Sequence, residues 1–331
     1  MRRGLLLLLL AGWVAFVVAG CTSQEEEGPA DPNRPLRIAV VPKGTMHVFW
    51  KSIRAGAKQG EAECANVKIS WQGPVKEDDR ESQVNLVEAF IQKRVDGIVL
   101  APLDDKALVA PVRAAVAAGI PVVIIDSALA DEDVYVSFVA TDNYQGGVLG
   151  ARRLAELLGE KGGKAILLRY QVGSASTENR EKGFLDEIAK HKNIELISSD
   201  QYAGATVETA MTAAQALLTK YGEGQVDGVF CPNESSAYGM LQALTSSGRA
   251  GKIKYVGFDA SDRLVEALQK GYIHGLVVQD PVRMGREGVK TMVAHLRGEK
   301  VEKRIDTGVV VVTLENLDDP EIDKLVHPAL E

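Results

Sequence analysis

The feature that most constrains the fold of this chain is an internal repeat. Two stretches run through the same parts in the same order: a Val-Asp-Gly start, a strand, a proline, a helix, a glycine, a second strand and a final aspartate. The first runs from Val95 to Asp126 and the second from Val226 to Asp259, and their aspartate-to-aspartate intervals are 30 and 32 residues. Each unit is too large for a short solenoid repeat. We therefore expect two lobes of like topology with a cleft and a hinge between them.

Short apolar, β-rich runs alternate with amphipathic helical patterns from Leu36 onward. The predicted strands are 37–41, 68–71, 97–101, 121–125, 134–139, 165–168, 195–198, 228–231, 254–258 and 275–278. The predicted helices are 49–65, 79–94, 106–118, 144–158, 177–191, 207–221, 235–247, 263–271 and 282–296. Uniformly apolar strands are covered on both faces, and strand–helix alternation implies right-handed crossovers in parallel sheets. The sequence predicts an α/β fold of two similar, doubly wound lobes with parallel sheets.

The N-terminal residues predict export. Arg2 and Arg3 precede an apolar run over 5–18 that is short for a membrane span, and Val18-Ala19-Gly20-Cys21 follows. This order resembles the bacterial lipobox, in which cleavage precedes the cysteine and its thiol carries lipid. We expect 1–20 to be a lipoprotein signal peptide and 21–35 to be a lipidated Cys21 with a flexible acidic tether. An uncleaved anchor with an incidental cysteine is the alternative; either way the body lies outside the cytoplasm, in the periplasm or at the cell surface.

Composition and motifs argue against several classes of protein. The net charge is −7, which is unfavourable for binding nucleic acid, because proteins bind its phosphates with clustered Lys and Arg. We find no Gly-x-Gly-x-x-Gly after a strand, no Walker A loop and no Gly-x-Ser-x-Gly elbow. The five histidines are scattered without triad or metal-ligand spacing. We therefore expect a binding protein without catalytic residues, cofactor or metal.

Charged, amide and aromatic side chains follow the predicted strands of both lobes. Ligands of open parallel sheets bind beyond the carboxyl ends of the strands, so these side chains are candidates for a binding site. They are Lys43, His47, Phe49, Trp50, Asp104, Asp105, Asp126, Arg169, Arg180, Asn233, Asp259 and Gln279.

The aspartates among these candidates have a structural alternative. An aspartate at a strand end is often a helix cap or a turn residue, and we favour that interpretation for Asp104 and Asp105. Asp126 and Asp259 differ from them, because they occupy matching places in the two repeats. We expect these two carboxylates to bind ligand.

The chemistry of the remaining candidates suits a polyol. A sugar hydroxyl both donates and accepts, so carboxylates and amides beside an arginine hold it well. The apolar C–H face of a sugar ring packs on an aromatic ring, which Phe49 and Trp50 provide. Alternatively, these two aromatics belong to a core and Arg180 lies on a solvated helix.

Seven short segments occur in a distinctive order. They are His47-Val48-Phe49-Trp50, Ile124-Ile125-Asp126, Thr141-Asp142-Asn143, Asn179-Arg180-Glu181-Lys182-Gly183-Phe184, Cys231-Pro232-Asn233-Glu234, Val256-Gly257-Phe258-Asp259 and Val277-Val278-Gln279. This series resembles that of the periplasmic sugar-binding proteins of the ribose-binding type, which feed ABC importers. The resemblance extends from about Leu36 to Leu314.

The resemblance implies a type I periplasmic binding protein with a multi-strand hinge. Its N-terminal lobe would be 36–141 with 281–307, and its C-terminal lobe 142–280 with 308–331. Such a protein captures a small polar ligand, here a monosaccharide, by hinge closure, works with a separate ABC permease and ATPase, and is a monomer. Together with the side chains at the strand ends, the resemblance leads us to expect these ligand-binding residues: Lys43, His47, Phe49, Trp50, Asp126, Ser127, Arg180, Asn233, Asp259 and Gln279.

Departures from the family pattern leave the ligand open. Ser127 stands where ribose binders commonly carry an arginine, and His47 stands in place of an asparagine. An aromatic expected from the second lobe near residues 203–205 is absent. Pro42-Lys43 and Asp126-Ser127 instead resemble the branch that binds autoinducer-2. The alternative function is therefore an extracytoplasmic sensor that delivers such a sugar-like signal to a receptor.

Overall fold

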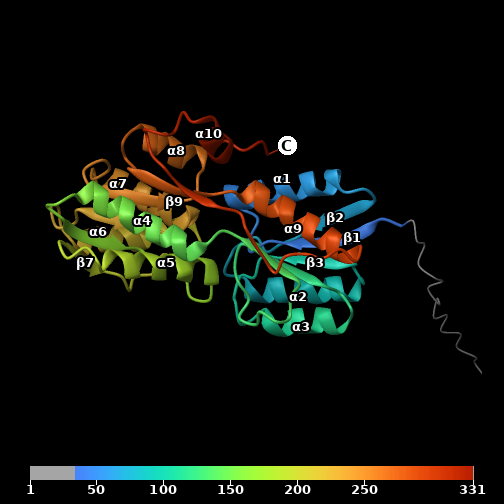
Figure 1. Ribbon diagram of the computed structural model, residues 1–331. Coiled ribbons are helices and arrows are strands. Elements are labelled where there is room, and N and C mark those ends of the chain that lie inside the picture. Colours follow the sequence, from blue (N-terminus) through green and yellow to red (C-terminus); the bar gives the residue numbers. More distant parts are fainter. Residues whose placement is uncertain (1–33, 331) are drawn as a thin grey trace, which may run out of the picture. The chain divides into compact units, whose positions relative to one another are not determined.

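The computed structural model describes residues 34–330. The predicted signal peptide, Cys21 and the tether up to residue 33 lie outside these residues. The chain from Pro35 onward is one compact unit, and it contains two lobes (Figure 1). Within residues 34–330, none of the helices is both long and apolar enough to cross a membrane.

The first lobe is built on a six-stranded sheet with the order β11-β5-β4-β3-β1-β2. Its strands are β1 (Leu36–Val41), β2 (Val67–Trp71), β3 (Gly97–Leu100), β4 (Val122–Ile125), β5 (Ser137–Ala140) and β11 (Arg304–Asp306). Its helices are α1 (Val48–Glu63), α2 (Arg80–Gln92), α3 (Val109–Ala117) and α9 (Pro281–Leu296).

The second lobe repeats this plan with the order β12-β10-β9-β8-β6-β7. Its strands are β6 (Gly163–Leu167), β7 (Ile194–Ser198), β8 (Gly228–Phe230), β9 (Lys254–Phe258), β10 (Gly275–Gln279) and β12 (Val309–Val312). Its helices are α4 (Asn143–Leu158), α5 (Ala175–Ile188), α6 (Val207–Lys220), α7 (Glu234–Ser246), α8 (Asp262–Gln269) and α10 (Pro320–Val326). Strand for strand the two orders are the same, which confirms the predicted pair of similar α/β lobes.

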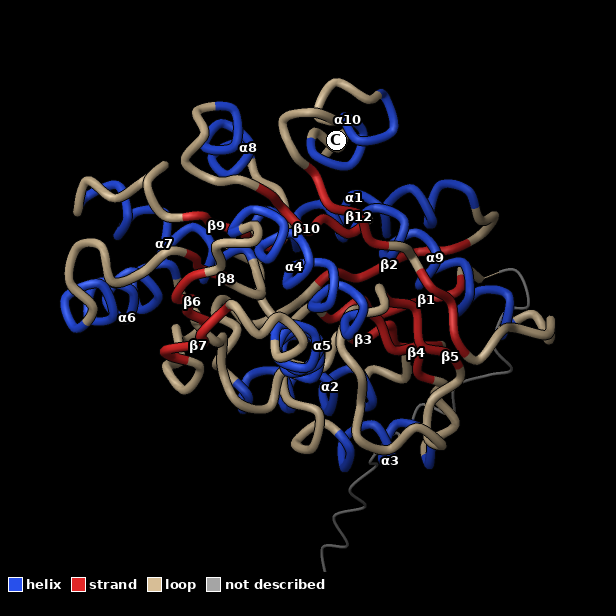
Figure 2. The backbone as a smooth tube through the Cα atoms, turned by 60° about the vertical axis from the view of Figure 1, so that its left-hand side comes forward, coloured by secondary structure: helices blue, strands red, loops and turns tan. Residues whose placement is uncertain are grey.

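Both faces of each sheet are covered, as the apolar strands predict. In β1, alternate side chains point to opposite faces: Ile38 and Val40 pack with α1 and α9, whereas Ala39 and Val41 pack with α2 and α3. In the second lobe, α4 and α5 cover one face, and α6, α7, α8 and α10 cover the other. Figure 2 shows helices on both sides of the strands in each lobe.

Three strands, β5, β11 and β12, differ from the sequence prediction. The strand expected over 134–139 is formed over Ser137–Ala140, and we did not predict β11, β12 or α10. β12 pairs with β10 in antiparallel orientation, so the second sheet is not wholly parallel. β11 is only three residues long, and such a short edge strand carries little periodicity.

Three segments cross between the lobes, after β5, after β10 and between β11 and β12. At the hinge, Thr141 Oγ1 donates to the carbonyl oxygen of Gly308 at 3.1 Å. We keep the lobe boundaries at residues 141, 280 and 307 as a proposal, because each falls where the chain passes from one sheet to the other.

Glycines allow one pair of helices in each lobe to approach closely. In the first lobe, a Cβ at Gly56 of α1 would overlap the Val282 carbonyl oxygen of α9. In the second lobe, a Cβ at Gly147 of α4 would overlap the Arg180 carbonyl oxygen of α5. In each lobe, the helix that follows a crossing from the other lobe (α9 or α4) packs against the helix that follows the first strand of the sheet (α1 or α5).

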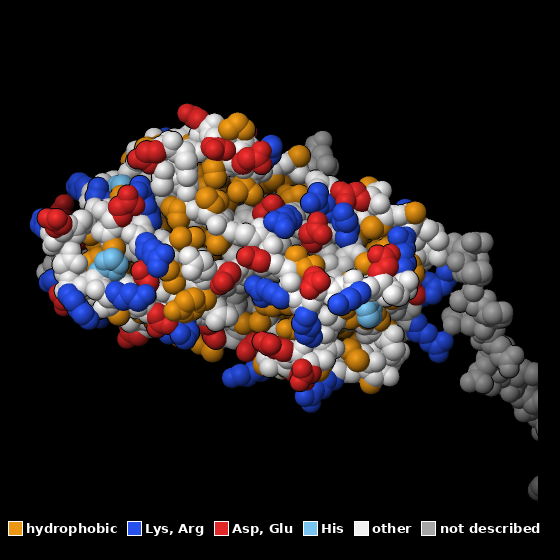
Figure 3. Space-filling view, viewed as in Figure 1, with side chains coloured by type: hydrophobic (Ala, Val, Ile, Leu, Met, Phe, Trp, Pro, Cys, Tyr) orange, Lys and Arg blue, Asp and Glu red, His pale blue; other side chains and the backbone are white. Residues whose placement is uncertain are grey.

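On the face seen in Figure 3, acidic and basic side chains are interspersed over both lobes.

Candidate functional site

A cavity lies between the lobes, at the carboxyl ends of the strands. The empty space there, part of which is open to solvent, amounts to about 330 Å³. Residues of both lobes line it: Lys43, His47, Phe49, Trp50, Glu77, Asp126, Tyr170, Ser174, Ser176, Thr177, Arg180, Asn233, Glu234, Asp259 and Gln279. All the predicted ligand-binding residues except Ser127 therefore meet at one place.

Asp126 and Asp259 occupy equivalent positions after β4 and β9. Both are buried, and both adopt a left-handed backbone, with φ of 61° and 69°. The Asp126 N–H donates to the Val139 oxygen, and the Asp259 N–H donates to the Val277 oxygen. A left-handed non-glycine residue costs about 1–3 kcal/mol, and such strain clusters at functional sites. Each lobe thus places at the cavity an aspartate whose backbone is strained.

Arg180 brings a buried cation into the cavity. Its guanidinium carbon lies 3.9 Å from the centre of the Phe258 ring, Nε donates to Asn143 Oδ1 at 2.8 Å, and Nη1 donates to the Pro232 oxygen at 3.0 Å. Burial lowers the pKa of Arg180, and the charge of Asp259 opposes this most strongly. Since a guanidinium does not deprotonate in proteins, Arg180 remains a charged donor, and its alternative as a solvated residue is wrong.

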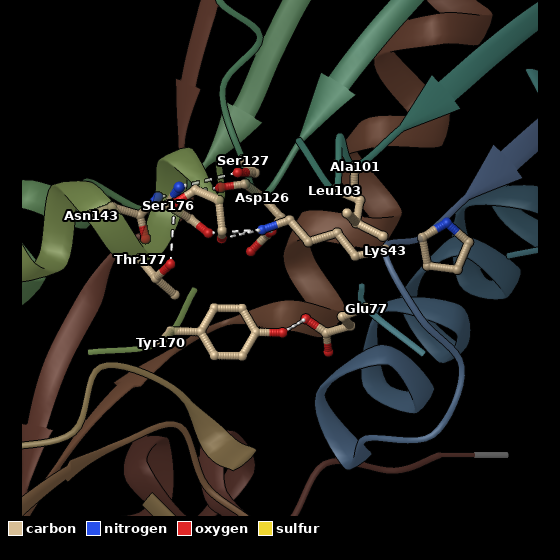
Figure 4. A network of polar contacts seen from close by, with 12 residues as sticks. Lys43, Glu77, Ala101, Leu103, Asp126, Ser127, Asn143, Tyr170, Ser176 and Thr177 are labelled. Atoms are coloured by element: carbon tan, nitrogen blue, oxygen red, sulfur yellow. Dashed lines mark hydrogen bonds and ion pairs between the residues drawn. The ribbon is translucent and has the colours of Figure 1, made fainter. Parts of the chain in front are cut away.

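Lys43 pairs with Asp126, with 3.0 Å between Nζ and Oδ2. The same Nζ donates across the cleft to Ser174 Oγ at 3.1 Å and Ser176 Oγ at 2.9 Å (Figure 4). Lys43 therefore joins the two lobes at the cavity wall.

Asp259 has two hydrogen-bond donors of its own. Gln279 Nε2 donates to Oδ1 at 2.7 Å, and the Glu234 N–H donates to Oδ2 at 3.1 Å. Burial raises the pKa of Asp259, and the nearby Arg180 charge is the largest opposing influence. Gln279, at the end of β10, thus links the second aspartate to the hinge.

The aromatic wall comes from both lobes. Phe49 and Trp50 meet edge to face, with ring centres 5.0 Å apart. From the second lobe comes Tyr170, which the sequence analysis missed. Tyr170 lies in the segment after β6, and this segment runs beside residues 203–205, since the Gly204 N–H donates to the Tyr170 oxygen. An aromatic side chain from this neighbouring segment thus lies close to the place expected near 203–205.

Glu77 holds these aromatics in place and was also missed. It accepts a hydrogen bond from Trp50 Nε1 at 2.7 Å. It accepts another from Tyr170 Oη at 2.8 Å (Figure 4). His47 Nε2 lies 3.3 Å from the same carboxylate. Glu77 lies in an irregular loop after β2, where no periodic pattern marks it.

Two predicted ligand-binding residues are already engaged within the protein. Ser127 is buried outside the cavity lining, and its Oγ accepts a hydrogen bond from the Ser176 N–H at 3.0 Å. Asn233 lines the cavity, but its Oδ1 caps α7 by accepting from Ser236, and its Nδ2 donates to Ser235 Oγ. Direct contact with a ligand remains a prediction for these two residues, as it does for the other predicted ligand-binding residues.

The other strand-end candidates lie elsewhere. Asp104 pairs with Arg80 and accepts from the Lys106 and Ala107 N–H groups, as expected of a turn residue. Arg169 pairs with the buried Glu181 at 2.6 Å. Neither Asp104 nor Arg169 lines the cavity.

Three lining residues carry buried polar atoms without a hydrogen-bond partner within residues 34–330. They are Asp126 Oδ2, Arg180 Nη2 and Gln279 Oε1. Asp126 Oδ2 is close enough to Lys43 for an ion pair but lacks hydrogen-bond geometry. Because an unsatisfied buried polar atom costs about 1–3 kcal/mol, these two acceptors and one donor call for a polar ligand.

Comparison with known proteins identifies relatives along most of the chain. The periplasmic binding protein domain matches residues 38–300. The D-ribose/D-allose-binding protein of Pseudomonas aeruginosa is 30% identical over 95% of this chain and 97% of its own length. The ribose import binding protein of Bacillus subtilis is 31% identical, over 90% of this chain and 95% of its own.

Solved structures of similar fold have sugars bound. An ABC transporter solute-binding protein from Agrobacterium vitis with bound D-fucose shares 38% identity and a TM-score of 0.84, over 88% of this chain and 100% of that one. One from Agrobacterium radiobacter in complex with D-arabinose shares 34% identity and a TM-score of 0.84, over 88% and 99%. These relatives are solute-binding proteins and not enzymes.

Proposed function

The chain belongs to the family of periplasmic binding proteins, and we propose that it captures a neutral monosaccharide by closure of its two lobes and delivers it to an ABC importer. The observation that carries this proposal is the set of buried atoms at the cavity that lack a hydrogen-bond partner within residues 34–330. Asp126 Oδ2 and Gln279 Oε1 accept, whereas Arg180 Nη2 donates. A sugar offers hydroxyl hydrogens to the first two atoms and a hydroxyl or ring oxygen to the third.

The charge of the lining favours a neutral ligand over an anionic one. Four acidic side chains line the cavity (Glu77, Asp126, Glu234 and Asp259) against the basic side chains of Lys43 and Arg180. A sugar acid or sugar phosphate would add negative charge to this excess, and like charges brought together without solvent are costly. The aromatic rings of Phe49, Trp50 and Tyr170 provide apolar surfaces for the C–H faces of a sugar ring.

We further propose that the protein is exported and held to a membrane by lipid on Cys21. The charged start, apolar run and small residues before Cys21 support this. The family relationship supports a separate permease and ATPase as partners, and we propose that the protein acts as a monomer.

A thermal-shift screen tests the ligand class. Residues 22–331 would be unfolded and refolded to remove any co-purified ligand. They would then be heated with D-ribose, D-allose, D-fucose, D-arabinose, nucleosides, polyols, autoinducer-2, gluconate and ribose 5-phosphate. A ligand that binds only the native state raises Tm by mass action. We expect a large rise with at least one of the four sugars. Isothermal titration would then give its Kd and stoichiometry.

Other outcomes of the screen would discard the sugar proposal. A rise with autoinducer-2 and with none of the sugars would favour the sensor alternative. A larger rise with gluconate or ribose 5-phosphate than with any neutral sugar would refute the charge argument.

A further inference from the structure

The helix that follows the first strand of each sheet, α1 after β1 and α5 after β6, begins at the cleft without a side-chain cap of its own. The residue that precedes α1 is His47, and the residue that precedes α5 is Ser174; neither side chain caps its helix. The free N–H groups at a helix start need acceptors. By contrast, α2, α4 and α9 are capped by Asp79, Asp142 and Asp280 from their own chain segment.

Each of these two helix starts receives its acceptor from the opposite lobe. Glu234 of the second lobe accepts hydrogen bonds from the Val48 N–H at 3.3 Å and the Phe49 N–H at 3.0 Å. Ser127 of the first lobe accepts one from the Ser176 N–H of α5 at 3.0 Å. In both helices the N–H group of the second residue is capped: Phe49 is the second residue of α1, and Ser176 is the second residue of α5.

We propose that Ser127 and Glu234 are reciprocal caps that act across the cleft and hold the closed form together independently of which sugar is bound. Donor and acceptor lie in different lobes, so opening the cleft breaks both caps. Figure 4 shows Ser127 and Ser176 facing one another, with Lys43 beside them. The proposal gives Ser127 a positioning role, in agreement with its place outside the cavity lining.

The charge and burial of Glu234 fit this role. A carboxylate at a helix N-terminus is stabilised by the helix dipole. Burial raises the pKa of Glu234, and the hydrogen bond from the Phe49 N–H is the largest influence that opposes this. When the cleft opens, the Glu234 carboxylate therefore returns to water, but the N–H groups at the start of α1 lose their acceptor.

Ser127→Ala and Glu234→Ala test the proposal, which rests on sugar binding as proposed above. Loss of a helix cap costs about 0.5–2 kcal/mol, so each variant is expected to raise the Kd by roughly 2- to 30-fold. The rise should lie in koff, measured by stopped-flow tryptophan fluorescence with whichever of D-ribose, D-allose, D-fucose and D-arabinose the wild type binds most tightly.

A matched control removes a cap that lies within one lobe. Asp79 is exposed and caps α2 by accepting from the Ser82 N–H. Asp79→Ala is expected to lower stability against urea while leaving Kd and koff unchanged. If all three variants shifted Kd and stability in the same proportion, the caps would be ordinary structural bonds and the proposal would be wrong.

A second variant supplies the missing cap locally. In His47→Ser, serine can cap α1 from its own segment, so Glu234→Ala should raise the Kd less in that background than in the wild type. An equal rise in both backgrounds would overturn the capping role of Glu234. Failure of the wild type to bind any of the four sugars would instead refute the proposed function, and with it this inference.

Discussion

Replacing Arg180 by methionine tests the site most directly. Methionine keeps an unbranched side chain against Phe258 but removes the cation and the unpaired Nη2. A hydrogen bond to a charged group contributes about 1.5–3 kcal/mol, which corresponds to a Kd about 10- to 150-fold higher. Asn143 Oδ1 and the Pro232 oxygen also lose their donors. The loss of affinity should therefore lie toward the upper end of this range.

The assay is isothermal titration with the sugar from the screen, corrected for the folded fraction by circular dichroism. Arg152→Met is the matched control, because Arg152 pairs with Glu187 on the outside of the second lobe and does not line the cavity. Arg180→Lys keeps the charge but not the planar fork that reaches several acceptors at once. We expect its Kd to fall between those of the wild type and Arg180→Met.

A Kd within twofold of the wild type for Arg180→Met would refute the reasoning. It would mean that the unpaired Nη2 does not contact the ligand. An equal loss in Arg152→Met would attribute the effect to general destabilisation. Only a loss confined to Arg180, with the lysine variant intermediate, supports a charged donor in the site.

Three further predictions concern packing, pH and closure. Gly147→Ala should lower the free energy of unfolding in urea by about 1–3 kcal/mol, because its Cβ meets the backbone of α5, whereas Gly222→Ala, with open space around it, should change it little. Burial lowers the pKa of His274 to about 4 from its ordinary 6.5. As pH falls from 6.5 to 4, the unfolded chain therefore binds a proton at His274 before the folded chain does, and the free energy of unfolding falls across that window. His274→Asn should make this fall smaller in urea titrations. Tyr170→Phe breaks the bond to Glu77 across the cleft and should raise the Kd about 2- to 10-fold through koff in stopped-flow dissociation; an unchanged koff would show that this bond does not hold the lobes closed.

The repeat made the two-lobed fold predictable, because it is a pattern in the sequence itself. Apolar runs such as Ile38–Val41 mark buried strands, and a matching aspartate follows one strand in each unit. The last strands were not predictable in this way. β12 is formed by four consecutive valines, yet its antiparallel direction depends on the return of the chain through the hinge, which no local pattern encodes.

The site was predictable only where side chains follow strands. Lys43, Asp126, Asp259 and Gln279 meet at the cavity because parallel strands end at one edge of each sheet. Asn233 follows β8 in the same way, and Arg180 lies in the helix after β6. The resemblance to a family of known pattern supported both residues.

The contacts made across the cleft could not be predicted from the sequence, because each depends on a residue of the opposite lobe. Glu77 and Tyr170 lie in different lobes, and each is unremarkable in its own segment; their bond exists only because two sheets of the same order face one another. The same holds for Glu234 and α1. Ser127 shows the converse, since it adjoins Asp126 of the cavity lining in sequence but bonds to the other lobe in space. Residues that bind the ligand follow from the topology of one lobe, whereas residues that govern closure follow from the pairing of two. Variants of the second class should therefore change koff and the extent of closure before they change which sugar is chosen.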